Sequence, residues 1–344
     1  MDFFKRLFYK SSRVDIAAGK AVSGPRLSLV GSDTPARTRI WAVGGGKGGV
    51  GKSLVAANLG IGLSRLGKKV LMVDVDLGAA NLHTLLNMDG GKVSLSNFFK
   101  SGSTDIIPFV SKTDFVNLDL VSGAKDSLDV ADNCGEGLLR LKEALHKVPY
   151  DYVLLDIGPG TASNILDLFL MADEGILLTT SEPTSIENSY RFLKCLFLRR
   201  IRNIANSQED TKIKELLHRV FAGQWSSRIK TVADILNRLR EIDPGRGELL
   251  KEILGNTSVS IVVNQTRTQA DREVGPAMKM ACRNYFGIDI GFLGDIAYED
   301  VVHESIRSKT PLALSGGQSE AARAIETCMQ RLTNNELRQK RRMA

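Results

Sequence analysis

Residues 46–53 read Gly-Lys-Gly-Gly-Val-Gly-Lys-Ser, which fits the phosphate-binding pattern G-x-x-x-x-G-K-[ST] at every fixed position. An apolar run, Arg39–Val43, precedes this segment, and apolar residues at helical spacing follow it over 54–66. Glycines let successive backbone N–H groups point at phosphate oxygens, and the helix adds its positive N-terminal end. The pattern predicts that a bound nucleotide contacts the following residues: Gly46, Lys47, Gly48, Gly49, Val50, Gly51, Lys52, Ser53 and Leu54.

The same strand-then-helix rhythm continues along the chain. Runs without polar alternation indicate strands buried on both faces, and stretches with helical spacing lie between them. This alternation predicts an α/β fold with a mostly parallel, doubly wound sheet of the P-loop NTPase type. The expected strands are 39–43, 69–75, 152–157, 175–180, 259–264 and 288–293, and the expected helices are 54–66, 136–147, 163–171, 185–199, 272–286 and 318–333.

Charge divides the 344-residue chain into parts. Residues 1–38 are a basic segment and linker with seven Lys and Arg against three Asp and Glu, and 334–344 is a basic tail with four against one. The body at 39–333 therefore carries none of the net charge of +7. Within it, residues 191–256 hold fourteen basic and eight acidic residues and predict an inserted helical subdomain. Basic patches can meet nucleic acid or anionic lipid, or can be ordinary solvated surface.

Composition excludes several classes of protein. With 43% hydrophobic and 25% charged residues, the chain is typical of a globular protein and not of a disordered or fibrous one. No apolar stretch reaches the length of a transmembrane helix, no secretory signal is expected, and we expect a cytosolic protein. The four cysteines, at 134, 195, 282 and 328, form no CxxC pair, so neither a disulfide framework nor a zinc site is indicated.

Carboxylates follow two of the expected strands. Asp74 and Asp76 end the run that begins at Lys69, and Asp156 ends the run that begins at Tyr152. An aspartate just past a strand end can orient a water for attack on a γ-phosphate, and one in the position of Asp156 can hold Mg²⁺ beside the loop. Carboxylates at strand ends can instead cap the next turn, and both interpretations stay open for the first pair.

Lys47, directly after the first glycine, gives the loop the form K-G-G-x-G-K-[ST], which resembles the deviant Walker A motif of the MinD/ParA family. The segments at 73–82, 152–160 and 292–311 resemble that family's two switches and its base-enclosing loop. The resemblance covers 39–190 and 257–333 and is nearest to MinD and the flagellar-number ATPases, since residues 156–160 read D-I-G-P-G. It does not cover the N-terminal 38 residues, the insert or the tail.

The resemblance implies roles for particular residues. Lys47 would reach the partner's nucleotide across a dimer, Asp76 would act on the attacking water, and Asn81 would shape the first switch. Asn264 would read adenine, since an amide offers both a donor and an acceptor, although it could equally cap a turn. The implied cofactors are ATP and Mg²⁺, with Ser53, Asp76 and Asp156 around the metal.

The resemblance further implies an ATPase that dimerises with ATP, binds a surface and is released when an unidentified protein partner stimulates slow hydrolysis. Such a protein positions machinery such as flagella or the division site. The alternative is a ParA-type partition ATPase that rides on nonspecific DNA. A scaffold that binds but does not hydrolyse nucleotide is disfavoured, because Lys47, Lys52, Asp76 and Asp156 are all present.

Two segments bear on the choice of surface. A helix over Met1–Lys10 would gather Phe3, Phe4, Leu7 and Phe8 on one side, with basic residues opposite, as in-plane membrane helices do. The segment could also dock on a protein or stay disordered. A membrane is preferred, which predicts a cytoplasmic protein bound peripherally to the inner membrane face in its ATP state. DNA would instead meet the basic side chains of the insert, namely Arg199, Arg200, Arg202, Lys212, Lys214, Arg228 and Lys230.

Overall fold

Eight strands form one sheet in the order β3-β4-β2-β5-β1-β6-β7-β8, and every neighbouring pair is parallel except β3 with β4. The computed structural model describes residues 37–76, 80–89, 93–123, 134–206, 231–314 and 319–343, with a few positions between 211 and 218. The strands are β1 (Arg39–Gly44), β2 (Val70–Asp74), β3 (Ser111–Lys112), β4 (Leu118–Val121), β5 (Tyr152–Asp156), β6 (Glu174–Thr180), β7 (Val259–Thr266) and β8 (Gly291–Ala297).

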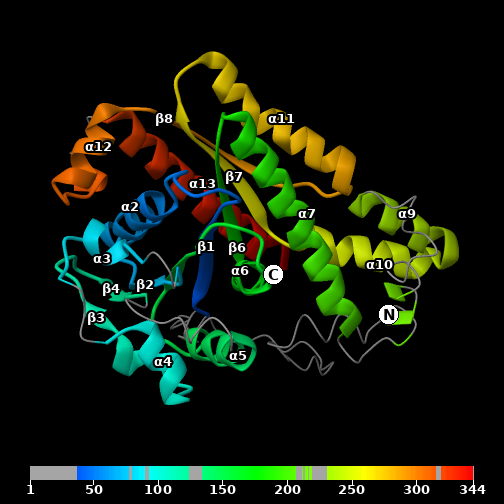
Figure 1. The fold of residues 1–344 in the computed structure, drawn as a ribbon, viewed down its shortest axis with the longest axis horizontal. Coiled ribbons are helices and arrows are strands. Elements are labelled where there is room, and N and C mark those ends of the chain that lie inside the picture. Colours follow the sequence, from blue (N-terminus) through cyan, green and yellow to red (C-terminus); the bar gives the residue numbers. More distant parts are fainter. Residues whose placement is uncertain are drawn as a thin grey trace, which may run out of the picture. The chain divides into compact units, whose positions relative to one another are not determined.

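Helices cover both faces of the sheet (Figure 1). On one face α2 (Lys52–Arg65) lies against the central strands, and α13 (Glu320–Met343) packs beside it and along β8. On the other face α6 (Ser163–Leu170), α7 (Pro183–Asn206) and α11 (Gln269–Phe286) pack on β1, β6, β7 and β8. The remaining elements are α3 (Leu82–Leu85), α4 (Leu95–Ser101), η1 (Ile107–Phe109), α5 (Cys134–Leu145), α9 (Val232–Ile242), α10 (Pro244–Gly255), α12 (Asp300–Arg307) and η2 (Leu312–Leu314).

The central strands are buried on both faces. Every residue of β2 and β5 is buried, and Ile40–Val43 of β1 are completely so. Two helical layers leave no solvent face, so these strands do not alternate between apolar and polar residues. The prediction of a parallel, doubly wound sheet is confirmed. In detail, the last long strand is β8 at Gly291–Ala297, which begins three residues after the expected start at residue 288. The strands β3 and β4 were not predicted.

The predicted insert is helical where it is described. α7 is a continuous helix of 24 residues, so the boundary expected at residue 191 falls inside it. The side chain of Thr231 caps α9 by accepting from the Asp234 N–H, and Asp243 caps α10 just ahead of Pro244. The N-terminal basic segment predicted at 1–38 lies outside the described residues, apart from its last two.

A buried carboxylate fastens α13 to the sheet. Glu336 accepts a hydrogen bond from Trp41 Nε1 at 2.8 Å and another from the Tyr152 hydroxyl at 3.0 Å. Arg39 Nε lies 3.3 Å from the same carboxylate. Since Trp41 belongs to β1 and Tyr152 to β5, the contact joins the last helix to the two strands at the centre of the sheet. Burial and the charge of Glu336 raise the pKa of Tyr152, so its hydroxyl stays protonated and donates.

We expect Glu336→Ala to lower the free energy of unfolding by about 3 kcal/mol, because two buried donors lose their acceptor. Urea denaturation followed by circular dichroism measures the change. Glu326→Ala is the matched control, since Glu326 is exposed on the same helix. Equal stability of the two variants would show that Glu336 does not fasten α13.

Candidate functional site

The phosphate loop leaves β1 at the carboxyl edge of the sheet, where the winding of the chain reverses. From β1 the chain passes to β2 on one side, returns to β5, and then crosses to β6 on the other side of β1. In parallel α/β sheets, ligands bind in the crevice outside the carboxyl ends of the strands at such a switch point. The loop that the sequence identified therefore lies where this fold forms a binding site.

Glycines let this loop lie close to its neighbours. Gly49 and Gly51 have φ angles of 77° and 92°, which favour glycine. A Cβ on Gly46 would overlap the backbone carbonyl of Asn188 in α7. Gly160 N donates to Gly45 O at 3.3 Å, so the second switch predicted at 156–160 borders the loop. Ser53 and Leu54 lie in the first turn of α2.

Four of the predicted site residues come together at the start of α2. Lys52 is buried, with a relative exposure of 8%. Burial lowers the pKa of Lys52, and the charges of Asp156 and Asp76 oppose that shift. The Ser53 hydroxyl hydrogen-bonds to Asp156. A cation, a hydroxyl and two carboxylates thus meet at the end of the phosphate loop.

The ends of β2 and β5 place two buried carboxylates side by side. Asp74 and Asp156 are partners in the strand register, and both are almost inaccessible to solvent. Burial first, and then the charge of Asp74, raise the pKa of Asp156 to about 7. Burial also raises the pKa of Asp74 to about 6, against three backbone hydrogen bonds that lower it. The pair favours a bound cation, because a positive charge relieves the repulsion.

Asp74 caps the turn that follows β2, which is one of the two roles that its position in the sequence left open. Its Oδ1 accepts from Asp76 N at 3.2 Å, and its Oδ2 accepts from Asn81 N at 2.9 Å and from Leu82 N at 3.1 Å. The capping interpretation therefore holds for Asp74, which fixes both ends of the first switch. The Asp76 side chain extends to within about 3 Å of where a Cβ would lie on Gly158 of the second switch. Asn81 is exposed.

The residues at this point suit Mg²⁺. Asp156 Oδ1 is buried and has no hydrogen-bond partner among the described residues, and Ser53 contributes a hydroxyl beside it. Mg²⁺ prefers oxygen ligands and is usually held by one or two carboxylates together with phosphates and water. Across the described ranges, no cluster of three or more His, Cys, Asp or Glu side chains is arranged to hold a metal alone. Ser53 and Asp156 nevertheless supply the oxygen ligands that Mg²⁺ takes.

Lys47 and Asn264 make contacts within the chain. Lys47 Nζ lies 2.7 Å from Glu182 Oε2 and 3.1 Å from Thr184 Oγ1, just after β6. Asn264, at the end of β7, is buried, and its amide nitrogen donates to Val50 O at 2.8 Å. Both residues that were predicted to contact a nucleotide therefore make hydrogen bonds at the phosphate loop. Lys47 joins the loop to the segment after β6, and Asn264 joins it to the end of β7.

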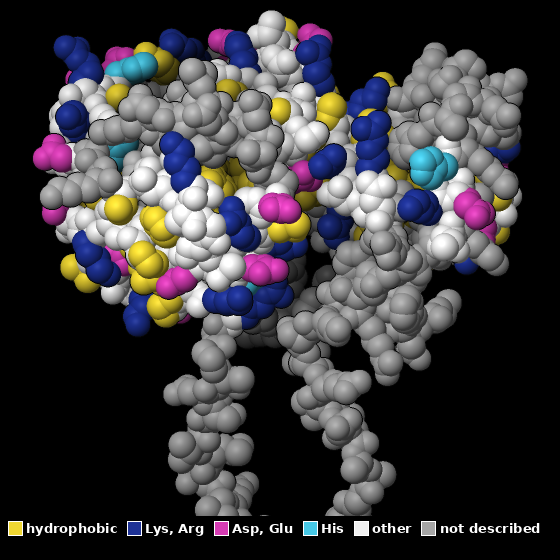
Figure 2. Space-filling model, turned by 60° about the horizontal axis from the view of Figure 1, so that its bottom comes forward, with side chains coloured by type: hydrophobic (Ala, Val, Ile, Leu, Met, Phe, Trp, Pro, Cys, Tyr) yellow, Lys and Arg dark blue, Asp and Glu magenta, His cyan; other side chains and the backbone are white. Residues whose placement is uncertain are grey.

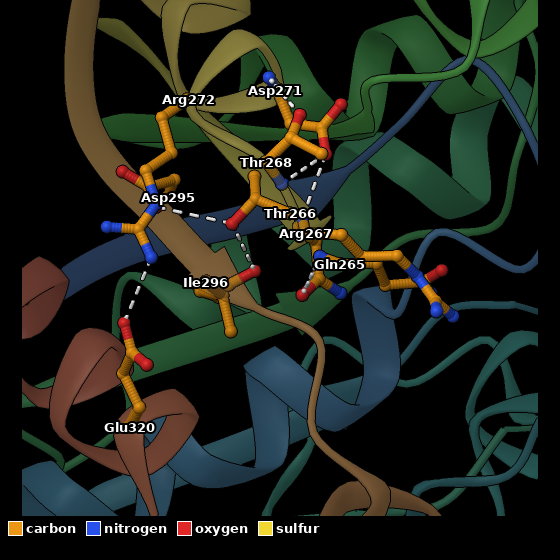
Figure 3. A network of polar contacts seen from close by, with 10 residues as sticks. Gln265, Thr266, Arg267, Thr268, Asp271, Arg272, Asp295, Ile296 and Glu320 are labelled. Atoms are coloured by element: carbon orange, nitrogen blue, oxygen red, sulfur yellow. Dashed lines mark hydrogen bonds and ion pairs between the residues drawn. The ribbon is translucent and has the colours of Figure 1, made fainter.

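A polar network covers the neighbouring ends of β7 and β8 (Figure 3). Asp271 Oδ2 accepts from Arg267 N at 2.8 Å and from Thr268 N at 2.9 Å, and these bonds lower its pKa to about 2. Arg272 joins Asp295 of β8 to Glu320 of α13 at 3.5 and 3.2 Å. These bonds order the loop after β7, beside the phosphate loop, and the sequence pattern gave no sign of them.

The basic residues expected to meet DNA divide into two groups. Arg199 is engaged in a double hydrogen bond with Asp167 of α6, at 2.8 and 2.6 Å, and burial lowers the pKa of Arg200. The pair of Arg199 with Asp167 joins α7 to α6. Arg202 and Lys214 are exposed, whereas Lys212, Arg228 and Lys230 lie outside the described residues. On the face drawn in Figure 2, the described Lys and Arg side chains are scattered among acidic and apolar ones.

The three described cysteines are free, and burial raises the pKa of Cys282 and of Cys328 to about 12. Neither thiol is thereby prepared to bind a metal as thiolate. No helix in the described part of the chain combines the length and hydrophobicity needed to cross a bilayer.

The sheet, the loop and the two strand-end carboxylates define a P-loop nucleoside triphosphatase fold. A family model described as an AAA domain matches residues 38–210, half of the chain. The chain belongs to the MinD/ParA family of P-loop ATPases.

A putative septum site-determining protein MinD of Oltmannsiellopsis viridis is 31% identical over 203 residues, which are 59% of this chain and 61% of the relative. The chain thus spans about six-tenths of that relative's length. MinD of Pyrococcus horikoshii, solved with Mg-ADP, superposes with a TM-score of 0.55 at 22% identity, over 86% of this chain and 96% of the other. A ParA family ATPase of Chlorobium tepidum superposes with a TM-score of 0.55 at 17% identity, over 86% of this chain and 98% of the other. These two likenesses concern the fold alone.

We expect the metal-free protein to lose stability as pH rises. The folded pKa values of Asp74 and Asp156, about 6 and about 7, exceed the roughly 4 of an unfolded aspartate. Their protonated forms therefore contribute stability that is complete below about pH 4 and is lost as pH rises through the folded values.

Thermal unfolding in EDTA between pH 5 and 8 measures this loss. Asp156→Asn should reduce the pH dependence, because it removes one of the two paired charges. Asp114→Asn, at an exposed position, should leave the dependence unchanged. An Asp156→Asn protein with the wild-type pH dependence would contradict the assignment.

Proposed function

We propose that the chain binds ATP with Mg²⁺ and hydrolyses it to ADP and phosphate. The observation that carries the proposal is the meeting of Lys52, Asp76 and Asp156 at the end of a glycine-rich loop. Loop N–H groups and the N-terminus of α2 would bind the phosphates, and Lys52 would neutralise charge on the β- and γ-phosphates. Lys52 is buried, and the charges of Asp156 and Asp76 favour its protonated form.

In this proposal Ser53, Asp76 and Asp156 would hold Mg²⁺. The ion would neutralise charge on the β- and γ-phosphates. Asp76 would orient a water molecule in line with the γ-phosphate, so that the new P–O bond forms as the bond to the bridging oxygen breaks. The hydrogen bond from Asp76 N to Asp74 holds the backbone of that residue in place. Asn81 would shape the switch through its own N–H bond to Asp74.

We further propose an ATP-dependent homodimer in which Lys47 reaches the partner's nucleotide. The contact of Lys47 with Glu182 supports this, because both side chains are substantially exposed, at 38% and 63%. An exposed ion pair contributes about 0–1 kcal/mol, so Lys47 can exchange Glu182 for a phosphate at little cost. The lysine is then available at the molecular surface, as a contact across a dimer requires.

The proposed cellular role is that of a spatial regulator in the cytoplasm. The ATP dimer would bind the inner membrane face through two copies of the amphipathic segment Met1–Lys10, and an unidentified protein would stimulate slow hydrolysis and release it. Each Lys or Arg near an anionic surface contributes about 1 kcal/mol, and pairing two weak anchors raises the affinity through effective concentration. The machinery positioned would be the division site or flagella. The relatives named as septum site-determining proteins support the first.

The alternative is a ParA-type partition ATPase that binds nonspecific DNA. The pairing of Arg199 with Asp167 and the burial around Arg200 weigh against it, because these cations are occupied in packing. Exposed Lys194 and Arg202 are the better candidates for phosphate contacts in α7.

Asp76→Ala should retain ATP binding and lose turnover, because the metal and loop contacts remain while the water is no longer oriented. Phosphate release and nucleotide affinity, measured separately, test this. Lys52→Ala should instead lose ATP binding, because the phosphates lose the loop's buried cation. Wild-type turnover by Asp76→Ala would exclude the assigned role.

Lys47→Ala should bind ATP through Lys52 and the loop N–H groups but should not dimerise with it. Sedimentation with ATP and with ADP measures the assembly. Lys68→Ala, another exposed lysine, is the control and should dimerise normally. An ATP dimer of ordinary affinity in Lys47→Ala would remove the contact across subunits.

Deletion of residues 1–10 should preserve ATP binding and abolish ATP-dependent cosedimentation with anionic liposomes. Phe8→Glu should impair liposome binding more than Lys5→Ala, because it places a carboxylate among acyl chains. Binding should fall with salt. Unchanged liposome binding after the deletion, together with salt-sensitive DNA binding that Lys194→Glu and Arg202→Glu abolish, would establish the alternative.

A further inference from the structure

We propose that Asn264 and Gln265 are positioning residues that aim the N–H groups of the phosphate loop at its ligand. They do so by holding two consecutive carbonyl groups of the loop at the end of β7. The inference rests on the proposed nucleotide binding and assigns Asn264 a role in addition to the adenine recognition expected from the sequence.

The contacts join two segments that lie more than two hundred residues apart in the sequence. Asn264 Nδ2 donates to Val50 O at 2.8 Å, and Gln265 Nε2 donates to Gly49 O at 3.4 Å. Asn264 Oδ1 in turn accepts from Gln265 N at 2.9 Å. Gln265 lies where β7 leads into the ordered loop drawn in Figure 3.

Peptide geometry turns this contact into a device for binding anions. In a trans peptide the C=O and N–H groups point to opposite sides of the chain. When the carbonyls of Gly49 and Val50 are held toward β7, the N–H groups of the next residues, Val50 and Gly51, are directed away from it. Successive N–H groups turned to one side form a concave site for phosphate oxygens.

Backbone conformation on both sides of the contact is consistent with this role. Gln265 has a φ of 62°, an uncommon value for a residue with a side chain, and its N–H reaches Asn264 Oδ1 in that conformation. On the opposite side, a Cβ on Gly51 would overlap Asn264 Nδ2. The closeness of Asn264 thus explains why residue 51 is glycine, beyond its φ of 92°.

Adenine recognition by Asn264 is compatible with these contacts. The residue is only 5% exposed, and each polar atom of its amide has one backbone partner. An amide offers two N–H donors and two acceptor lone pairs, so one of each remains for a base edge. The hold on the loop is therefore a role of Asn264 that does not depend on which base is bound.

The test compares ligands with and without a base. Affinities for ATP, GTP and inorganic tripolyphosphate are measured by calorimetry for wild type, Asn264→Ala, Gln265→Ala and the exposed control Asn284→Ala. We expect Asn264→Ala to weaken tripolyphosphate binding by a factor of about ten, and Gln265→Ala by less, because its bond is longer. ATP binding should fall at least as much as tripolyphosphate binding. Asn284→Ala should match wild type.

Two results would overturn the inference. One is a loss for ATP alone, with tripolyphosphate affinity unchanged, which would make Asn264 a reader of the base. The other is unchanged affinity for every ligand in both variants, provided that circular dichroism shows the wild-type fold for each of them. If Asn264→Ala does not fold, Gln265→Ala decides, since its side chain is exposed. Wild-type protein that binds tripolyphosphate but not ATP would refute the proposed function while leaving this comparison valid, and wild-type protein that binds neither would refute both.

Discussion

Two like charges buried side by side are the constraint on which this site depends. Asp74 and Asp156 end adjacent strands, in register, in the least accessible part of the sheet. A parallel sheet brings its carboxyl ends to one edge, so the fold imposes this closeness. The chain offsets the repulsion in two ways. Backbone N–H groups of the first switch surround Asp74, while Ser53 and Lys52 face Asp156. Each compensation fixes the position of a segment that borders the phosphate loop.

Much of the fold was predictable because its signals are local. The loop and strands such as Tyr152–Asp156 are set by short patterns, and two-sided burial removes the polar alternation from the strands. The pattern failed where burial is one-sided or the element is short. β8 carries polar and glycine positions and was placed three residues early. β3 has two residues, too few for any period, and pairs antiparallel at the sheet edge.

The site was predictable as a set of residues but not as a set of contacts. Sequence spacing gave Lys52, Ser53 and Asp156 because each follows a motif at a fixed distance. No spacing could show that Arg199 would be neutralised by Asp167 across two helices, or that the amide of Asn264 would face Val50. Such partners are decided by which elements the fold places together. A residue's chemical type therefore restricted its possible roles, and its neighbours selected among them.

α7 links the phosphate loop to the insert. At its beginning, Glu182 contacts Lys47, and the Asn188 carbonyl lies against Gly46. Farther along, it is joined to α6 by the pair of Arg199 with Asp167, and it ends at Asn206, within the insert predicted at 191–256. A helix of 24 residues is about 36 Å long. Because α7 is one unbroken helix fixed both at its first turns and at Arg199, the loop and the start of the insert are held in a single frame. Arg199 therefore serves to fix that frame, because its pair with Asp167 joins α7 to α6.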